Sequence, residues 1–252
     1  MTIEIVPADR AEAWLVRIDD MDQSYVDLGD PTRLVFDYVR WIGDVADLVA
    51  PPSRAVRAVH VGGAGLTLPR YVAATRPRSS QIVLEPDAAL IERVRAELPL
   101  PPRSGIRIRP VDGRRGLAGL RDASTDLIVL DAFSRGRVPT ELLTGEAWAE
   151  MARVLAPGAL VAANLTDRAP FADARRAIAG LRAALPDIAL AAEPATLRGR
   201  RSGNLVVVAG HAVPTAELAA RVAGRAAPYR LLDAGAVSDT LGGGAPLSDP
   251  RP

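Results

Sequence analysis

The sequence predicts an α/β protein built on a doubly wound, seven-stranded sheet, with a small antiparallel β appendage at its N-terminus. From about residue 55, short apolar runs alternate with helix-like stretches, which is typical of a parallel sheet covered on both faces. The residues before this region alternate between apolar and polar side chains, as half-buried strands do. A chain of 252 residues is long enough to bury such a core.

The N-terminal residues are expected to form the appendage. Apolar and polar side chains alternate in three runs with polar turns between them. These runs cover residues 3–6, 13–18 and 23–28. A helix is then expected from Leu34 to about Val49, because apolar residues recur at helical spacing and Pro51-Pro52 follows. Residues 1–50 therefore read as a β appendage with a linking helix.

The main domain is expected between residues 51 and 212. Its strands are expected at residues 56–61, 81–84, 106–111, 126–131, 159–164, 188–191 and 205–209. The helices that separate the first six are expected at residues 68–75, 88–98, 113–120, 141–155 and 171–185. The last two strands have only a short connection and are expected to pair antiparallel. Residues 213–252 read as a C-terminal helix and, from about Asp233, a flexible, poorly ordered tail.

Composition excludes several kinds of chemistry. The chain has no cysteine and no lysine, and it has two histidines. Disulfides, thiolate nucleophiles, Schiff bases and a Walker-type lysine are therefore absent. His60 lies inside an apolar strand and His211 follows another, so both are expected to be structural. Acid–base chemistry is expected from Asp, Glu or Tyr.

Charge and hydropathy indicate a cytoplasmic protein that binds small molecules. The 31 basic and 30 acidic residues are mixed along the chain, without the basic stripe of a nucleic-acid-binding protein. The short cluster at residues 198–201 reads as a solvated loop or as a receiver of a carboxylate or phosphate. No apolar run of 18 residues and no signal-peptide pattern is present, so we expect no membrane contact.

Polar and glycine residues follow the first four predicted strands of the main domain, where open α/β sheets bind their ligands. Gly62-Gly63-Ala64-Gly65 ends the first strand and lets backbone approach a ligand closely. Glu85-Pro86 follows the second, at the position of an acid that binds ribose hydroxyls. Asp112-Gly113 follows the third, where an acid could accept from an adenine amino group, and Asp131 ends the fourth.

Two other interpretations compete with a nucleoside site. Each acid could instead cap the helix that follows it, but three acids on successive strand ends favour ligand binding. A nicotinamide-dependent dehydrogenase would need a third glycine where this chain has Leu68. We therefore favour a nucleoside-containing ligand other than a nicotinamide dinucleotide.

The motifs resemble those of the spermidine synthases and their relatives, the polyamine aminopropyltransferases. The resemblance covers roughly residues 13–210. It includes Gln23-Ser24-Tyr25, residues 62–68, Glu85-Pro86-Asp87, Asp112-Gly113 and residues 131–134. It implies a Rossmann-like main domain of the class I S-adenosylmethionine-dependent methyltransferase type. It also implies a homodimer without a metal, in which decarboxylated S-adenosylmethionine gives its aminopropyl group to an amine.

The resemblance implies roles for the donor-side residues. Glu85 would hold the ribose beside the loop of residues 62–65, and Asp112 with Gly113 would hold the adenine. Asp131 would serve as the base for the attacking amine.

The resemblance also implies an acceptor side. Gln23 matches a family position that lines the substrate side, and Tyr25 is a further candidate from the same strand. Asp37 would keep an acid of the family, and Ser134 stands in the catalytic loop.

Two family acids are replaced in this chain. Ala64 stands where the family has an Asp that binds the donor's aminopropyl ammonium, and Ser134 where it has a second Asp that binds the amine. A buried cation without its partner costs about 3–5 kcal/mol. The acceptor therefore need not be putrescine and could be another amine or another small molecule. The donor could be S-adenosylmethionine, and the reaction then a methyl transfer. The alternatives are a non-catalytic dimeric nucleoside-binding sensor or scaffold, and a remnant that binds nothing.

Overall fold

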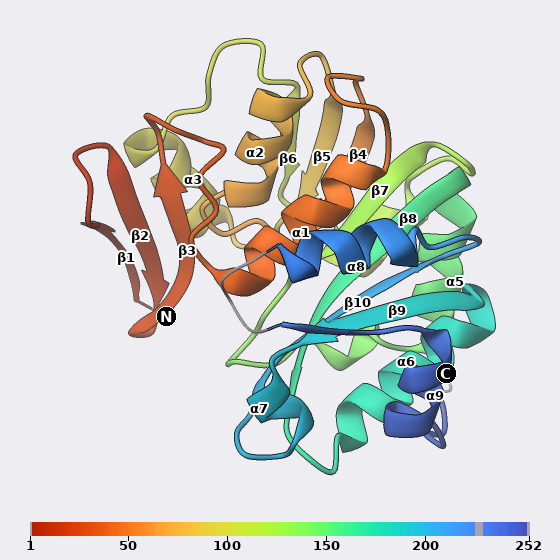
Figure 1. Cartoon of the computed structure of the whole chain (residues 1–252). Coiled ribbons are helices and arrows are strands. Elements are labelled where there is room, and N and C mark those ends of the chain that lie inside the picture. Colours follow the sequence, from red (N-terminus) through yellow and green to blue (C-terminus); the bar gives the residue numbers. More distant parts are fainter. Residues whose placement is uncertain (1, 225–228, 251–252) are drawn as a thin grey trace.

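The N-terminal part of the chain forms the predicted antiparallel sheet. The computed structural model describes residues 2–224 and 229–250 (Figure 1). Three strands pair in the order β1-β2-β3. They are β1 (Ile3–Pro7), β2 (Ala13–Ile18) and β3 (Met21–Asp27). The linking helix α1 (Asp37–Leu48) packs on the main domain, against the strands and helices of one face.

The main sheet contains eight described strands in the order β11-β9-β10-β8-β7-β4-β5-β6. They are β4 (Arg57–Val61), β5 (Ser80–Leu84), β6 (Ile106–Arg109), β7 (Thr125–Leu130), β8 (Leu155–Asp167), β9 (Asp187–Ala192), β10 (Gly203–Gly210) and β11 (Arg230–Leu232). The strands from β6 through β5, β4 and β7 to β8 are parallel. Strand β10 is antiparallel to both β8 and β9, which confirms the predicted terminal pair.

Helices cover both faces of the main sheet, as a doubly wound fold requires (Figure 1). One face packs against α1, α2 (Thr67–Thr75) and α8 (Thr215–Ala223). The other packs against α4 (Gly113–Ala118), α5 (Gly145–Val154), α6 (Ala172–Ala184) and α9 (Ala234–Leu241). Helix α3 (Ala88–Glu97) shares a third apolar cluster with β2 and β3, so it joins the appendage to the main domain. None of the helices in the described ranges is long and apolar enough to cross a membrane.

The C-terminal part differs from the prediction. Strand β11 adds an eighth strand by pairing with the edge strand β9, and its three residues are too short to show an alternating pattern. The tail predicted to be poorly ordered from about Asp233 instead forms α9. The Asp233 side chain accepts a hydrogen bond from the Ala236 amide at 2.9 Å and caps this helix. Val237 and Leu241 are buried in the core, which explains why the segment is held.

The helix predicted over residues 141–155 is divided in two. The short 3-10 helix η1 (Thr140–Leu142) precedes α5. The Thr144 hydroxyl accepts a hydrogen bond from the Ala147 amide at 3.2 Å, so α5 begins with its own cap. Another short helix, α7 (Pro194–Leu197), lies in the connection between β9 and β10.

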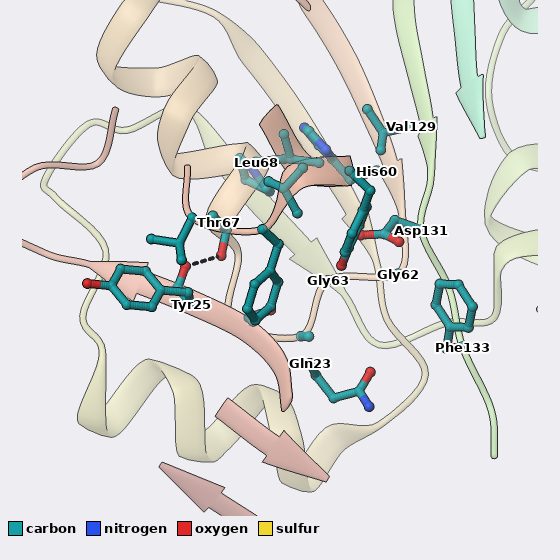
Figure 2. Close-up of a pocket in the computed structure, with 17 residues that line it drawn as sticks. Gln23, Tyr25, His60, Gly62, Gly63, Thr67, Leu68, Val129, Asp131 and Phe133 are labelled. Carbon is teal, nitrogen blue, oxygen red and sulfur yellow. Dashed lines mark hydrogen bonds between the residues drawn. The ribbon is translucent and has the colours of Figure 1, made fainter. Parts of the chain in front are cut away.

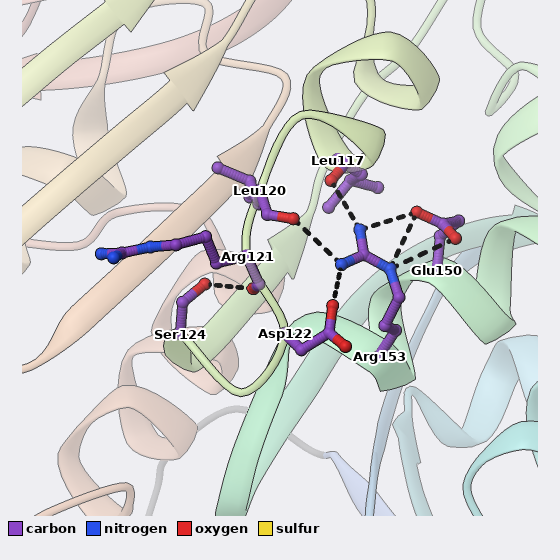
Figure 3. A network of polar contacts seen from close by, with 7 residues as sticks. All are labelled: Leu117, Leu120, Arg121, Asp122, Ser124, Glu150 and Arg153. Atoms are coloured by element: carbon purple, nitrogen blue, oxygen red, sulfur yellow. Dashed lines mark hydrogen bonds and ion pairs between the residues drawn. The ribbon is translucent and has the colours of Figure 1, made fainter.

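A single arginine in the last turn of α5 holds the loop between α4 and β7. The Arg153 guanidinium donates to the carbonyl oxygens of Leu117 and Leu120, at 3.3 and 3.0 Å (Figure 3). It also pairs with Glu150 at 2.9 Å and with Asp122. Because Leu117 lies in the last turn of α4, this network fixes the helix whose N-terminus reaches the candidate site.

Candidate active site

The glycine loop after β4 passes directly over the end of β7. Gly62 has φ of +89°, in the left-handed region that favours glycine. A Cβ atom at this position would lie 2.3 Å from the Asp131 carbonyl oxygen. The Asp131 amide donates to the Val61 carbonyl at 2.9 Å, so the loop and Asp131 are held together. Gly62 is therefore required for the close approach of these two strand ends.

Because Gly65 has no side chain, strand β3 of the N-terminal sheet can pack directly against the glycine loop. The Gly65 amide donates to the Ser24 hydroxyl at 3.0 Å. A Cβ atom at Gly65 would lie 2.7 Å from Val26 and 2.8 Å from Ser24. The Thr67 hydroxyl donates to the Tyr25 carbonyl at 2.8 Å just beyond (Figure 2). The last glycine of the motif therefore serves the packing of β3, while the first two face the crevice.

The Glu85 carboxylate accepts hydrogen bonds from the backbone of the glycine loop, and it does not cap α3. It accepts from the Gly63 amide at 3.0 Å and from the Asp87 amide at 3.1 Å, and the Ala64 amide contributes a further hydrogen bond. The cap of α3 is Asp87, which accepts from the Leu90 amide. Burial raises the pKa of Glu85, and these backbone hydrogen bonds oppose the rise.

Asp112 does cap the helix that follows it. Its side chain accepts from the Arg115 amide at 2.9 Å, so the capping interpretation describes one role of this residue. Gly113 begins α4, and a Cβ atom there would lie 2.5 Å from Val61 and 2.8 Å from Leu142. Pro86 is exposed in the loop between β5 and α3. These residues lie at the carboxyl ends of β5 and β6, where the nucleoside was expected.

Asp131 lies at the centre of a small polar cluster. The Asn164 side chain donates to Asp131 Oδ1 at 2.9 Å, and the Tyr38 hydroxyl contributes a second hydrogen bond. Burial raises the pKa of Asp131 to about 6, and these two hydrogen bonds oppose the rise. Burial and the charge of Asp131 hold the pKa of Tyr38 well above its ordinary value. The buried Asn164 Oδ1 has no partner among the described residues.

Asp131 opens onto a cavity of about 50 Å³ between the glycine loop, β3 and the start of α1 (Figure 2). Its lining includes Gln23, Tyr25, Phe36, Tyr38, His60, Gly62, Gly63, Ala64, Asp131 and Phe133. The volume is sufficient for roughly four water-sized groups. The cavity therefore suits a short alkyl chain or the reacting ends of two substrates.

No protein-family model matches the chain. A polyamine aminopropyltransferase from Vibrio vulnificus (strain CMCP6) is 28% identical over 134 residues, which cover 52% of this chain and 44% of that protein. The match therefore spans less than half of that relative. A crystal structure of a probable spermidine synthase from Corynebacterium glutamicum ATCC 13032 matches with a TM-score of 0.90 and 28% identity. That match covers 99% of this chain and 94% of the other.

The chain is spermidine synthase-like. Two more distant structures show the same fold. Spermidine synthase from Thermotoga maritima matches with a TM-score of 0.61 and 16% identity, over 95% of this chain and 80% of that one. Human methyltransferase-like protein 13, in complex with SAH, matches with a TM-score of 0.60 and 19% identity, over 87% of this chain and 95% of that one. The Rossmann-like, methyltransferase-type fold is thereby confirmed.

The four acceptor-side candidates of this spermidine synthase-like chain lie in different places. Gln23 and Tyr25 line the cavity, although the Tyr25 hydroxyl points away and donates to Asp9 at 2.5 Å (Figure 2). Asp37 lies outside the lining, half-exposed and paired with Arg40 at 2.8 Å. Ser134 lines a second cavity of about 440 Å³, on the side of α6. The structure therefore brings two of the four to Asp131.

Sequence reasoning missed several residues around Asp131. Tyr38 and Phe36 come from the start of α1, which the helical pattern marked only as apolar. Asn164 holds Asp131 from outside the cavity lining; it is a polar residue near the end of a largely apolar strand, and the strand-end rule could have found it. His60 is buried and bonded to Gln81 at 2.9 Å, as expected of a structural histidine, and burial lowers its pKa to about 4.

Metal ligands are not grouped in the part of the chain that the structure describes. There, no set of three or more His, Asp or Glu residues is placed to hold an ion. The polar side chains of the Asp131 cluster are a carboxylate, an amide and a phenol, which suit hydrogen bonds to organic substrates.

Proposed function

We propose that this protein is a transferase that alkylates an amine with an S-adenosyl-type donor. The observation that carries the proposal is the Asp131 cluster. A carboxylate with a pKa of about 6 is ionised at neutral pH and can accept a proton there. Asp131 lies beside the glycine loop and at the carboxyl end of a strand, which is where open α/β sheets bind their ligands.

The donor half of the site would hold the nucleoside. The loop of residues 62–65 would face the donor, with Glu85 and Pro86 at the ribose and Asp112 with Gly113 at the adenine. Glu85 suits this role because a carboxylate has about four acceptor positions, and three backbone amides use part of them. The bound SAH of the human structure with this fold supports an S-adenosyl donor.

The acceptor half would deprotonate the nucleophile. The amine nitrogen forms a bond to the transferred carbon of the donor while the carbon–sulfur bond breaks. The bonding pair goes to sulfur, which changes from a sulfonium to a thioether, and the amine's proton passes to Asp131. Burial in the cavity disfavours the ammonium form, so the amine would be a better nucleophile there than in water.

The identity of the donor depends on Ala64. This residue lines the cavity and carries no charge, so the acid that selects an aminopropyl ammonium in the family is absent. We propose aminopropyl transfer if the decarboxylated donor binds, and methyl transfer if S-adenosylmethionine does. We also propose that the protein forms a homodimer and is located in the cytoplasm.

Calorimetric titration with S-adenosylmethionine and with its decarboxylated form tests the donor. A clear preference for the decarboxylated form supports aminopropyl transfer, and equal or better binding of the carboxylated form supports methyl transfer. Binding of either donor without turnover of any amine would support the sensor or scaffold alternative. Binding of neither would contradict the proposed function.

A further inference from the structure

The cavity beside Asp131 is unusually aromatic for this chain. The sequence contains three phenylalanines and four tyrosines. Two of each line the cavity, namely Phe36, Phe133, Tyr25 and Tyr38. The rings of Phe36 and Tyr38 are stacked, with centroids 6.2 Å apart. Aromatic walls around one carboxylate suit an amine with a single nitrogen, because they bury its methylene groups and attract the positive charge that develops on that nitrogen as it is alkylated.

Asp131 is the one carboxylate among the described residues that line this cavity. Three acids of the surrounding elements are already engaged. Asp9 pairs with Arg33 and accepts from Tyr25.

The other two acids, Asp37 and Glu193, are also paired with arginine. Asp37 pairs with Arg40, and Glu193 pairs with Arg201. Glu193 belongs to the surroundings of the cavity because its charge acts on Tyr229, which in turn interacts with Tyr38. A second ammonium group in the substrate would therefore find no free carboxylate among these acids.

An arginine–aspartate pair lies on the appendage side of the cavity. The Arg33 guanidinium lies over the Tyr25 ring, 5.7 Å from its centroid. The same guanidinium pairs with Asp9 at 2.9 Å, so Asp9 is not a free carboxylate for a second ammonium group on this side. A desolvated ammonium without a partner is costly, so this arrangement disfavours a diamine.

The Asp131 carboxylate and the size of the cavity match a primary amine. Asp131 can accept an N–H of the nucleophile, while the Asn164 side chain, which does not line the cavity, donates to its Oδ1 at 2.9 Å and orients the carboxylate. The cavity volume of about 50 Å³ favours a nitrogen that carries one small alkyl group.

We propose that the acceptor is a primary monoamine with a short apolar tail, and not a diamine. This inference rests on the proposed function and specifies its substrate class. The nitrogen would lie against Asp131, and the tail against Phe36 and Phe133. On transfer, the nitrogen–carbon bond forms, the donor's carbon–sulfur bond breaks, and the proton goes to Asp131.

Two amines of equal length test the inference. 1-Aminopentane and 1,4-diaminobutane have the same number of non-hydrogen atoms and differ in one terminal group. Each is titrated calorimetrically at pH 8 into the full chain, saturated with 5′-methylthioadenosine as a nucleoside without charged ends. We expect 1-aminopentane to bind at least about tenfold more tightly.

A variant pair gives a second readout. Phe133→Asp adds a carboxylate to the cavity wall and is expected to shift the preference toward the diamine at least about tenfold, while Phe133→Leu is expected to keep the monoamine preference. A wild-type preference below threefold, or a preference for the diamine, would overturn the inference and leave the proposed function standing. Binding of the nucleoside but of neither amine would contradict both.

Discussion

Asn164 donates a hydrogen bond to Asp131 Oδ1 at 2.9 Å, from β8, which pairs with the strand β7 that ends just before Asp131. This contact ties the predicted base to a buried amide whose own oxygen has no partner among the described residues. It orients the carboxylate and leaves a second acceptor beside it.

Replacing Asp131 by Asn should remove turnover and spare donor binding. Loss of a general base costs about 10²–10⁴-fold in rate. The neutral side chain keeps the shape of the cluster, so the donor's dissociation constant should change less than threefold. Steady-state kinetics and calorimetry check this, with the exposed Asp22→Asn as the matched control. Unchanged turnover in Asp131→Asn would contradict the assignment of the base.

Activity of the wild-type protein should fall as the pH decreases through about 6. The base must be ionised, and burial raises the pKa of Asp131 to about 6. kcat/KM should therefore be flat or limited by the amine above this value and decrease tenfold per pH unit below it. An acid limb centred near pH 4 would contradict a buried base.

Asp131→Asn should also stabilise the fold at neutral pH. The folded-state pKa of this carboxyl group lies above its ordinary value of 3.8, so its ionisation disfavours folding. The penalty is absent below pH 3.8, grows as the pH rises to about 6, and corresponds to at most about 3 kcal/mol above that. Denaturant unfolding at pH 7.5 should show the gain, and at pH 5 a smaller one. A destabilised variant at pH 7.5 would argue against this sign.

Replacing Asn164 by Ala should move the pH profile. The Asn164 hydrogen bond lowers the pKa of Asp131, so its loss should raise that pKa further and shift the acid limb to higher pH. A merely structural role would lower activity without moving the limb. The matched control is Asn204→Ala, whose side chain bonds Thr166 at 3.2 Å outside the cavity.

Glu85→Gln should weaken donor binding and leave amine binding unchanged. A charge-assisted hydrogen bond contributes about 1.5–3 kcal/mol, so the donor's dissociation constant should rise about tenfold to a hundredfold. The exposed Glu97→Gln, which interrupts only an ion pair with Arg93, serves as the control. Equal donor affinity in Glu85→Gln and the wild type would place the ribose elsewhere.

Most of the fold was predictable because hydrophobic pattern and turn residues agree. Strands β4, β5 and β7 are short, largely apolar runs followed directly by a glycine or an acid, and a helical stretch follows each of them. Strand β11 escaped prediction because three residues carry no period, and it forms only by pairing with β9. Helix α9 was obscured by the glycines after it, although Asp233 is an ordinary capping signal.

The candidate site was predictable where it is local to strand ends and unpredictable where it depends on packing. Asp131 and Glu85 follow their strands directly, so their place at the crevice follows from the sheet. Tyr38 reaches Asp131 only because α1 packs on the sheet next to β8 and β10, which no local pattern reveals. The position of Ser134 was unpredictable for the same reason, because it depends on how the loop after β7 packs, and this loop places Ser134 at the second cavity.

Detection of the alkylated amine tests the central claim most directly. The wild-type protein is incubated with 1-aminopentane and either S-adenosylmethionine or its decarboxylated form at pH 8, and the products are identified by mass spectrometry. We predict a methylated or aminopropylated 1-aminopentane from one of the two donors, absent in Asp131→Asn. A wild-type protein that binds a donor and forms no alkylated amine, either from 1-aminopentane or from 1,4-diaminobutane, would contradict the account.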